Sequence, residues 1–61
     1  MSMTKEQALE KSKWWHDLHE EANAEEAAGC HGMAERLRND ALDVERELRA
    51  VGFNVMDFYS A

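Results

Sequence analysis

Apolar residues recur at helical spacing along most of the chain, and the clearest run lies in its second half. There they stand three and four residues apart without a break, which is the spacing of one buried helix face. Gly52 then stands where a left-handed residue ends a helix, and Phe53 follows at the position that packs back against the last turn. The pattern predicts a helix over about 33–51. Its apolar seam consists of Ala34, Leu37, Ala41, Val44, Leu48 and Val51.

A sparser apolar stripe in the first half predicts a second helix over about 5–28. Thr4 and Gln7 have the spacing of a capping box. In that motif the threonine hydroxyl accepts a hydrogen bond from a first-turn N–H, and the glutamine side chain accepts one from the threonine N–H. One face of this helix should therefore be buried against the other helix. The stripe consists of Ala8, Trp15, Leu18 and Ala22.

The sequence Gly29-Cys30-His31-Gly32 separates the two patterns. Two glycines three residues apart disfavour a continuous helix by about 2 kcal/mol relative to alanine, so the segment predicts a tight turn. The apolar spacing nevertheless extends back through Cys30 to Ala27, and one unbroken helix is the alternative. The favoured fold class is all-α, a two-helix antiparallel hairpin in a single domain over residues 1–61.

An apolar tail, residues 53–61, follows the second helix. Large apolar side chains dominate it and Asp57 is its one charge. Because such a segment is too apolar to remain a solvated disordered tail, we expect it to pack. Its expected place is over the open end of the hairpin or in a partner.

Size and charge limit what the chain can do. With 61 residues, a domain buries only about 60% of its unfolded surface, so association with another chain would add stability. The single cysteine, Cys30, excludes an intrachain disulfide. The net charge of −6 disfavours direct binding to nucleic acid or to a membrane surface. Neither a membrane span nor a signal peptide is evident, which predicts a cytoplasmic protein.

Catalytic and cofactor motifs are not apparent in the sequence. It has no phosphate-binding glycine loop, nucleophile elbow or dinucleotide motif. His16 and His19 are three residues apart and share a helix face, which makes them weak candidates for a metal site. Partly exposed polar histidines are the favoured interpretation. We therefore expect a protein that is not an enzyme and that uses no cofactor.

Three surfaces are candidates for contact with another macromolecule. The first is Trp14, at the edge of the first apolar stripe, because tryptophan is enriched at interaction hot spots. The second is the segment 17–26, which carries five acidic residues and no basic one, and the third is the apolar tail. The candidate partner-binding residues are Trp14, Asp17, Glu21, Glu25, Phe53, Phe58 and Tyr59.

The favoured function is a small acidic protein–protein interaction module. It would act as a regulator or inhibitor, for example one encoded by a phage, or as a small subunit of an assembly, and its partner would present a basic and apolar surface. One alternative is a homodimeric four-helix bundle with a structural or scaffolding role. A second is an acidic mimic of nucleic acid that blocks the basic DNA- or RNA-binding groove of another protein.

Overall fold

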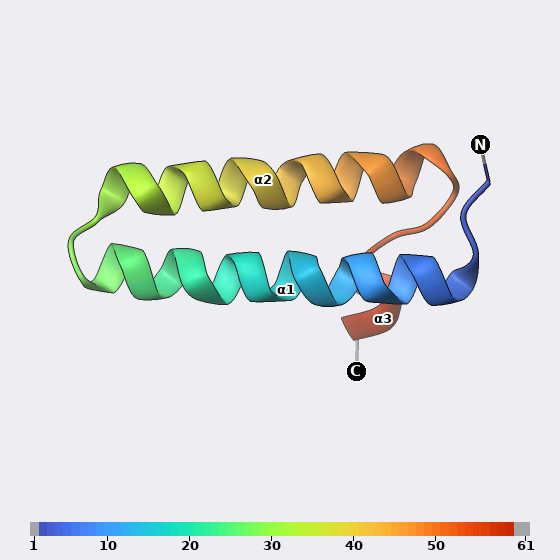
Figure 1. The fold of residues 1–61 in the computed structure, drawn as a ribbon, viewed down its shortest axis with the longest axis horizontal. Coiled ribbons are helices and arrows are strands. Elements are labelled where there is room, and N and C mark those ends of the chain that lie inside the picture. The colour runs from blue at the N-terminus through green and yellow to red at the C-terminus, as the bar shows by residue number, and fades with distance from the viewer. Residues whose placement is uncertain (1, 60–61) are drawn as a thin grey trace.

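The computed structural model describes residues 2–59, which form two long helices and one short helix. These are α1 (Lys5–Ala27), α2 (His31–Ala50) and α3 (Met56–Tyr59). In Figure 1, α1 and α2 run antiparallel side by side, and α3 lies along the edge of α1 that faces away from α2. The predicted all-α hairpin is confirmed. Met1 and the last two residues of the expected tail, 60 and 61, lie outside the described residues.

The start of α1 has the predicted capping box. The Gln7 backbone N–H donates to Thr4 Oγ1 at 3.1 Å, and the Thr4 N–H donates to Gln7 Oε1 at 3.0 Å. Two N–H groups that the helix leaves without intrahelical partners are thereby satisfied. Met3, just before the cap, packs against the core cluster that includes Ala8, as a hydrophobic staple requires.

A single glycine makes the turn between α1 and α2. Gly29 has a φ of 86°, which glycine adopts without the steric cost of a Cβ. Its N–H donates to the Glu26 carbonyl at 3.0 Å, and the Cys30 N–H donates to the Glu25 carbonyl at 2.8 Å. This is a Schellman motif, and it excludes the unbroken helix.

The second helix begins two residues earlier than the sequence predicts. The Ala34 N–H donates to the Cys30 carbonyl at 3.0 Å, so α2 starts at His31 and Gly32 lies inside its first turn. One left-handed residue is enough to reverse the chain, and the second glycine is therefore not needed by the turn. Cys30 is exposed at this turn.

The end of α2 repeats the same motif, as predicted. Gly52 has a φ of 89°, and its N–H donates to the Arg49 carbonyl at 3.1 Å. The Phe53 N–H reaches back to the Leu48 carbonyl at 2.9 Å. The chain leaves α2 here and turns back toward α1 (Figure 1).

The core between α1 and α2 is built mostly from small side chains. Ser12 is fully buried although the predicted stripe passes it by, and its hydroxyl donates to the Ala8 carbonyl at 2.9 Å. A serine whose hydroxyl is satisfied within its own helix can be buried without leaving a polar atom unpaired. Trp15, Leu37 and Val51 are half-buried. The other buried side chains are Ala8, Leu18, Ala22, Ala34, Ala41, Val44, Leu48 and Val55.

The tail folds back across one face of the hairpin. Val55 is buried, and the Phe53 and Phe58 rings pack against the core with their centroids 6.3 Å apart. Beyond them, the Tyr59 ring stacks on His16 with the centroids 5.1 Å apart. The tail therefore lies against α1 near the middle of that helix instead of closing the open end of the hairpin.

Candidate interaction surface

The two adjacent tryptophans of α1 have different surroundings. The Trp15 indole N–H donates to Glu45 Oε1 at 2.7 Å, and its ring meets His19 edge-on at a centroid distance of 4.6 Å. Trp14 points about 100° away from Trp15 on the helix, and 53% of its surface is exposed. It is the most exposed of the large apolar side chains described.

Trp14 lies on the flank of α1 opposite the tail. Trp14 and His16 are two residues apart, so they point about 200° apart on the helix. The ring of Tyr59 covers His16. We call the surface formed by Trp15, His16, Glu45 and the tail the tail-covered face, and Trp14 lies outside it.

Carboxylates surround Trp14 along the length of α1. Glu10, Trp14, Asp17, Glu21 and Glu25 follow one another at spacings of four, three, four and four residues, which places them within about 80° on the helix. We call these five residues the acidic stripe. Glu25 is half-buried and the other four are exposed. Within residues 2–59, none of the four carboxylates forms an ion pair.

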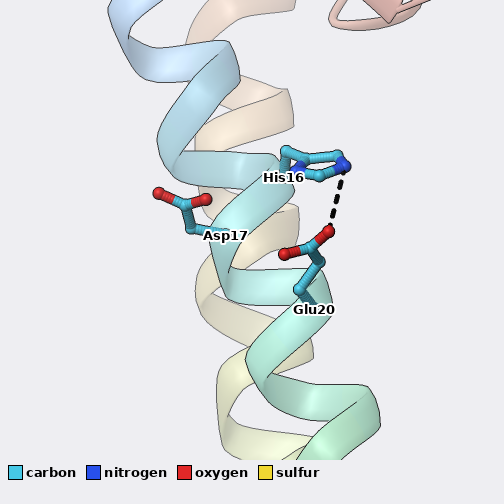
Figure 2. A group of neighbouring side chains, drawn as sticks. All are labelled: His16, Asp17 and Glu20. Carbon is cyan, nitrogen blue, oxygen red and sulfur yellow. Dashed lines mark ion pairs between the residues drawn. The ribbon is translucent and has the colours of Figure 1, made fainter.

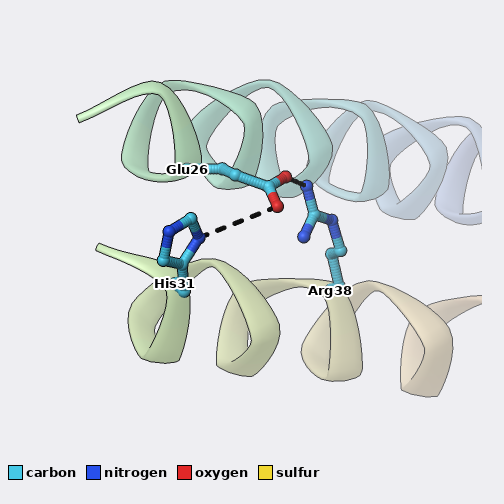
Figure 3. Close-up of polar contacts among 3 residues, drawn as sticks. All are labelled: Glu26, His31 and Arg38. Atoms are coloured by element: carbon cyan, nitrogen blue, oxygen red, sulfur yellow. Dashed lines mark hydrogen bonds and ion pairs between the residues drawn. The ribbon is translucent and has the colours of Figure 1, made fainter. Parts of the chain in front are cut away.

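Two basic side chains lie near the turn end of segment 17–26, and both approach the Glu26 carboxylate. Arg38 forms a hydrogen-bonded ion pair with Glu26, and His31 lies 3.9 Å from the same carboxylate (Figure 3). The hydrogen bond from Arg38, and then its charge, hold the pKa of Glu26 below its ordinary value. The turn end of segment 17–26 is therefore neutralised, whereas Asp17, Glu21 and Glu25 form no ion pair within residues 2–59.

The two histidines proposed as weak metal ligands do not face a common point. His16 stacks on Tyr59 and lies 3.6 Å from Glu20, whereas His19 turns toward Trp15. The group that does come together is His16, Asp17 and Glu20, with ligand atoms within 4.8 Å of one another. Figure 2 shows His16 and Glu20 facing each other while Asp17 points to another side of the helix. Asp17 and Glu20 are both exposed, and exposed acidic groups commonly lie this close together without a metal ion, so the cluster alone does not indicate a metal site.

A groove of about 770 Å³ lies at the open end of the hairpin. Met3, Ala50 and Val51 give it apolar walls, and Lys11 and Glu47 form an ion pair of 2.9 Å at its edge. We call it the open-end groove. A smaller cavity of about 200 Å³ lies beside the tail, between Glu45, Arg49 and Val55.

The sequence could not predict the open-end groove. Val51 is predicted to pack as the last residue of the seam, and Met3 lies just before the capping box. Whether they cover each other depends on how far the two helix ends stand apart, and this distance is a tertiary property without a local signal. Gln7 and Glu10 also line the groove, so it adjoins the acidic stripe.

The seven predicted partner-binding residues fall into two groups in the structure. Trp14, Asp17, Glu21 and Glu25 lie together on the acidic stripe. Phe53 and Phe58 are half-buried against the core, and Tyr59 lies on His16. Partial burial, and then the charge of Asp17, raise the pKa of Tyr59.

The chain matches no known protein family, no curated protein and no solved structure. None of the described helices contains an apolar run long enough to cross a membrane.

Proposed function

We propose that this chain is a protein–protein interaction module that binds a basic protein surface through the acidic stripe. The observation that supports this most is the position of Trp14, an exposed indole between carboxylates that have no cationic partner among the described residues. An indole face attracts arginine and lysine cations, and carboxylates beside it form hydrogen bonds with the same groups.

The charge of the chain supports the same proposal. With a net charge of −6, its field attracts basic surfaces and speeds their association, while like-charged surfaces are repelled. Binding of this kind suits a regulator or an inhibitor that blocks a basic site, and it equally suits a small subunit of an assembly. A protein whose basic groove normally holds DNA or RNA is one partner of this chemistry.

The proposal assigns the tail a different role from the stripe. Phe53 and Phe58 already pack against the core of the hairpin, and a partner would have to displace them in order to use them. The tail therefore acts as the third element of the fold in this proposal, and Trp14 is the apolar contact for the partner.

Affinity capture from the source cell, followed by binding measurements with the captured protein, tests the proposal. Trp14→Ala should raise Kd by the equivalent of about 2 kcal/mol, as expected for a hot-spot tryptophan. Met33→Ala is the matched control, because Met33 is 49% exposed and lies on α2. Circular dichroism should show equal helicity in both variants. Equal loss of affinity in the two variants contradicts the proposal.

Charge variants separate specific recognition from the effect of net charge. Glu21→Gln and Glu35→Gln remove one negative charge each from exposed positions, but only Glu21 belongs to the acidic stripe. We expect Glu21→Gln alone to slow association, and the difference between the two variants should shrink at high ionic strength.

Sedimentation equilibrium of the chain alone tests the alternative of a homodimer. A species larger than 7.0 kDa that forms without a partner would favour the four-helix bundle instead.

A further inference from the structure

The open-end groove offers an apolar site next to the acidic stripe. Its walls include Met3, Ala50 and Val51, and its volume of about 770 Å³ falls in the range of about 300–1,000 Å³ that ligand-binding clefts occupy. The lysine at its edge is neutralised by the ion pair between Lys11 and Glu47. An apolar group could therefore enter the groove without placing an unpaired lysine charge against it.

The groove and the acidic stripe form one continuous surface. Gln7, Glu10 and Lys11, which line the groove, precede Trp14 by seven, four and three residues. They therefore point within about 60° of Trp14 on the same helix. From Gln7 to Glu25 the surface extends about 27 Å, at about 1.5 Å per residue. A small molecule would fill the groove alone, whereas an elongated segment would cover both parts.

The charge of this surface indicates a basic occupant. Glu10, Asp17, Glu21 and Glu25 have no ion-pair partner among the described residues, and Lys11 is already paired. A second copy of this chain would bring the same carboxylates face to face, with a net charge of −6 on each copy. Like-charge repulsion therefore disfavours self-association through this surface.

The backbone of the hairpin favours a helical occupant. A peptide strand binds by pairing with an exposed sheet edge, and residues 2–59 contain no strand. Helices instead bind by placing apolar side chains from one face into a groove. A helix of about 18 residues would match the length of the surface.

We infer that the partner presents a basic amphipathic helix, with apolar side chains that enter the open-end groove and lysine or arginine side chains that lie on the acidic stripe. This inference rests on the proposed function and adds to it the kind of segment recognised and an apolar anchor site. Arginine from the same helix would lie over the Trp14 indole, one to two helical turns from the groove.

Designed peptides test the inference without knowledge of the partner. Three labelled peptides of about 18 residues are compared by fluorescence anisotropy with the full chain. The first is an amphipathic helix with leucine on one face and lysine or arginine on the other. The second replaces the leucines with alanine, and the third replaces the basic residues with glutamate. We expect the first to bind at least about tenfold more tightly than either of the others.

Two variants of the chain locate the apolar contact. Ala50→Trp places an indole in the open-end groove, and it should reduce the preference for leucine over alanine to less than about twofold. Ala27→Trp is the matched control, because Ala27 is also an exposed helical alanine and lies outside the groove. It should keep the full preference. Circular dichroism checks that both variants retain the helical content of the native chain.

The outcomes distinguish failure of this inference from failure of the proposed function. A leucine preference that is absent in the native chain, or that persists in Ala50→Trp, overturns the inference. If the basic peptide still binds more tightly than the glutamate peptide, the proposed function stands. Equal binding of those two peptides overturns both. If the native chain self-associates and Ala50→Trp abolishes that self-association, the groove binds a second copy of the chain. This outcome also overturns the inference.

Discussion

Trp14 and Trp15 are neighbours in the sequence, yet they belong to surfaces of opposite character. On the tail-covered face, the indole N–H of Trp15 is bonded to Glu45 at 2.7 Å, and aromatic rings surround the indole. On the acidic stripe, Trp14 is mostly exposed, and its neighbouring carboxylates form no ion pair in the part of the chain that the structure describes. The first arrangement satisfies its polar and apolar groups within the chain, whereas the second leaves them exposed to solvent.

The same difference extends along α2. Arg38 and Glu45 are seven residues apart, so they lie on the same side of that helix. Each pairs across the hairpin, Arg38 with Glu26 and Glu45 with Trp15. The contacts that hold the tail-covered face together thus come from three segments far apart in the sequence. Exposure together with unpaired charge distinguishes the acidic stripe from the tail-covered face, and it is the reason for proposing the stripe as a binding surface.

The largest expected difference between the two surfaces is in stability. Trp15→Ala should lower the free energy of unfolding by about 3 kcal/mol, because it removes a packed indole and leaves a cavity under the tail. Trp14→Ala should change it by no more than about 0.5 kcal/mol. Urea unfolding followed by circular dichroism measures both. Similar losses in the two variants would contradict the assignment of Trp14 to the surface.

The tail should contribute nearly as much as Trp15. Val55→Ala removes two buried methyl groups, and we expect a loss of about 2 kcal/mol. The adjacent Met56 is 50% exposed, so Met56→Ala should cost no more than about 0.5 kcal/mol. The same urea titration compares the two. An equal, small effect for both would mean that the tail is not part of the stable fold.

Much of the fold was predictable because its signals are local. The capping box at Thr4, the seam of α2 and the helix end at Gly52 each depend on residues within one or two turns. The turn between the helices was predicted less well, since Gly29 alone satisfies the Schellman motif and Gly32 joins α2. Local patterns cannot tell which of two glycines the backbone uses when both would serve.

The candidate surface was predictable in part. The acidic stripe follows from the spacing of Trp14, Asp17 and Glu21, which the helix brings to one side. The path of the tail does not follow from spacing, because residues 53–59 contain no turn signal that selects which face of α1 they cross. Local spacing therefore does not show that Phe58, a candidate contact for a partner, packs against the core cluster.

The hydrogen bond between Trp15 and Glu45 should account for a smaller part of the stability. A double-mutant cycle with Trp15→Phe and Glu45→Ala should give a coupling free energy of about 1 kcal/mol, typical of a partly exposed hydrogen bond to a charged group. Urea unfolding of the four proteins provides the values. Additive effects would mean that Glu45 does not hold the indole in solution, and the tail-covered face would then depend on packing alone.

The smallest effect is a dependence on pH from the ion pair at the turn. Because Arg38 holds the pKa of Glu26 below its ordinary value of 4.5, the folded state favours the ionised carboxylate. Its contribution is therefore present above about pH 4.5 and is lost as the pH falls through the lowered value. Glu26→Gln should flatten the acid side of the stability profile, measured by urea unfolding at a series of pH values. Arg38→Gln should flatten it in the same way, and the double variant should add nothing further, because the two residues act as one pair. If stability falls as steeply with decreasing pH in Glu26→Gln as in the native chain, the ion pair between Glu26 and Arg38 does not form in solution. The turn end of segment 17–26 would then be as open to a basic partner as the acidic stripe.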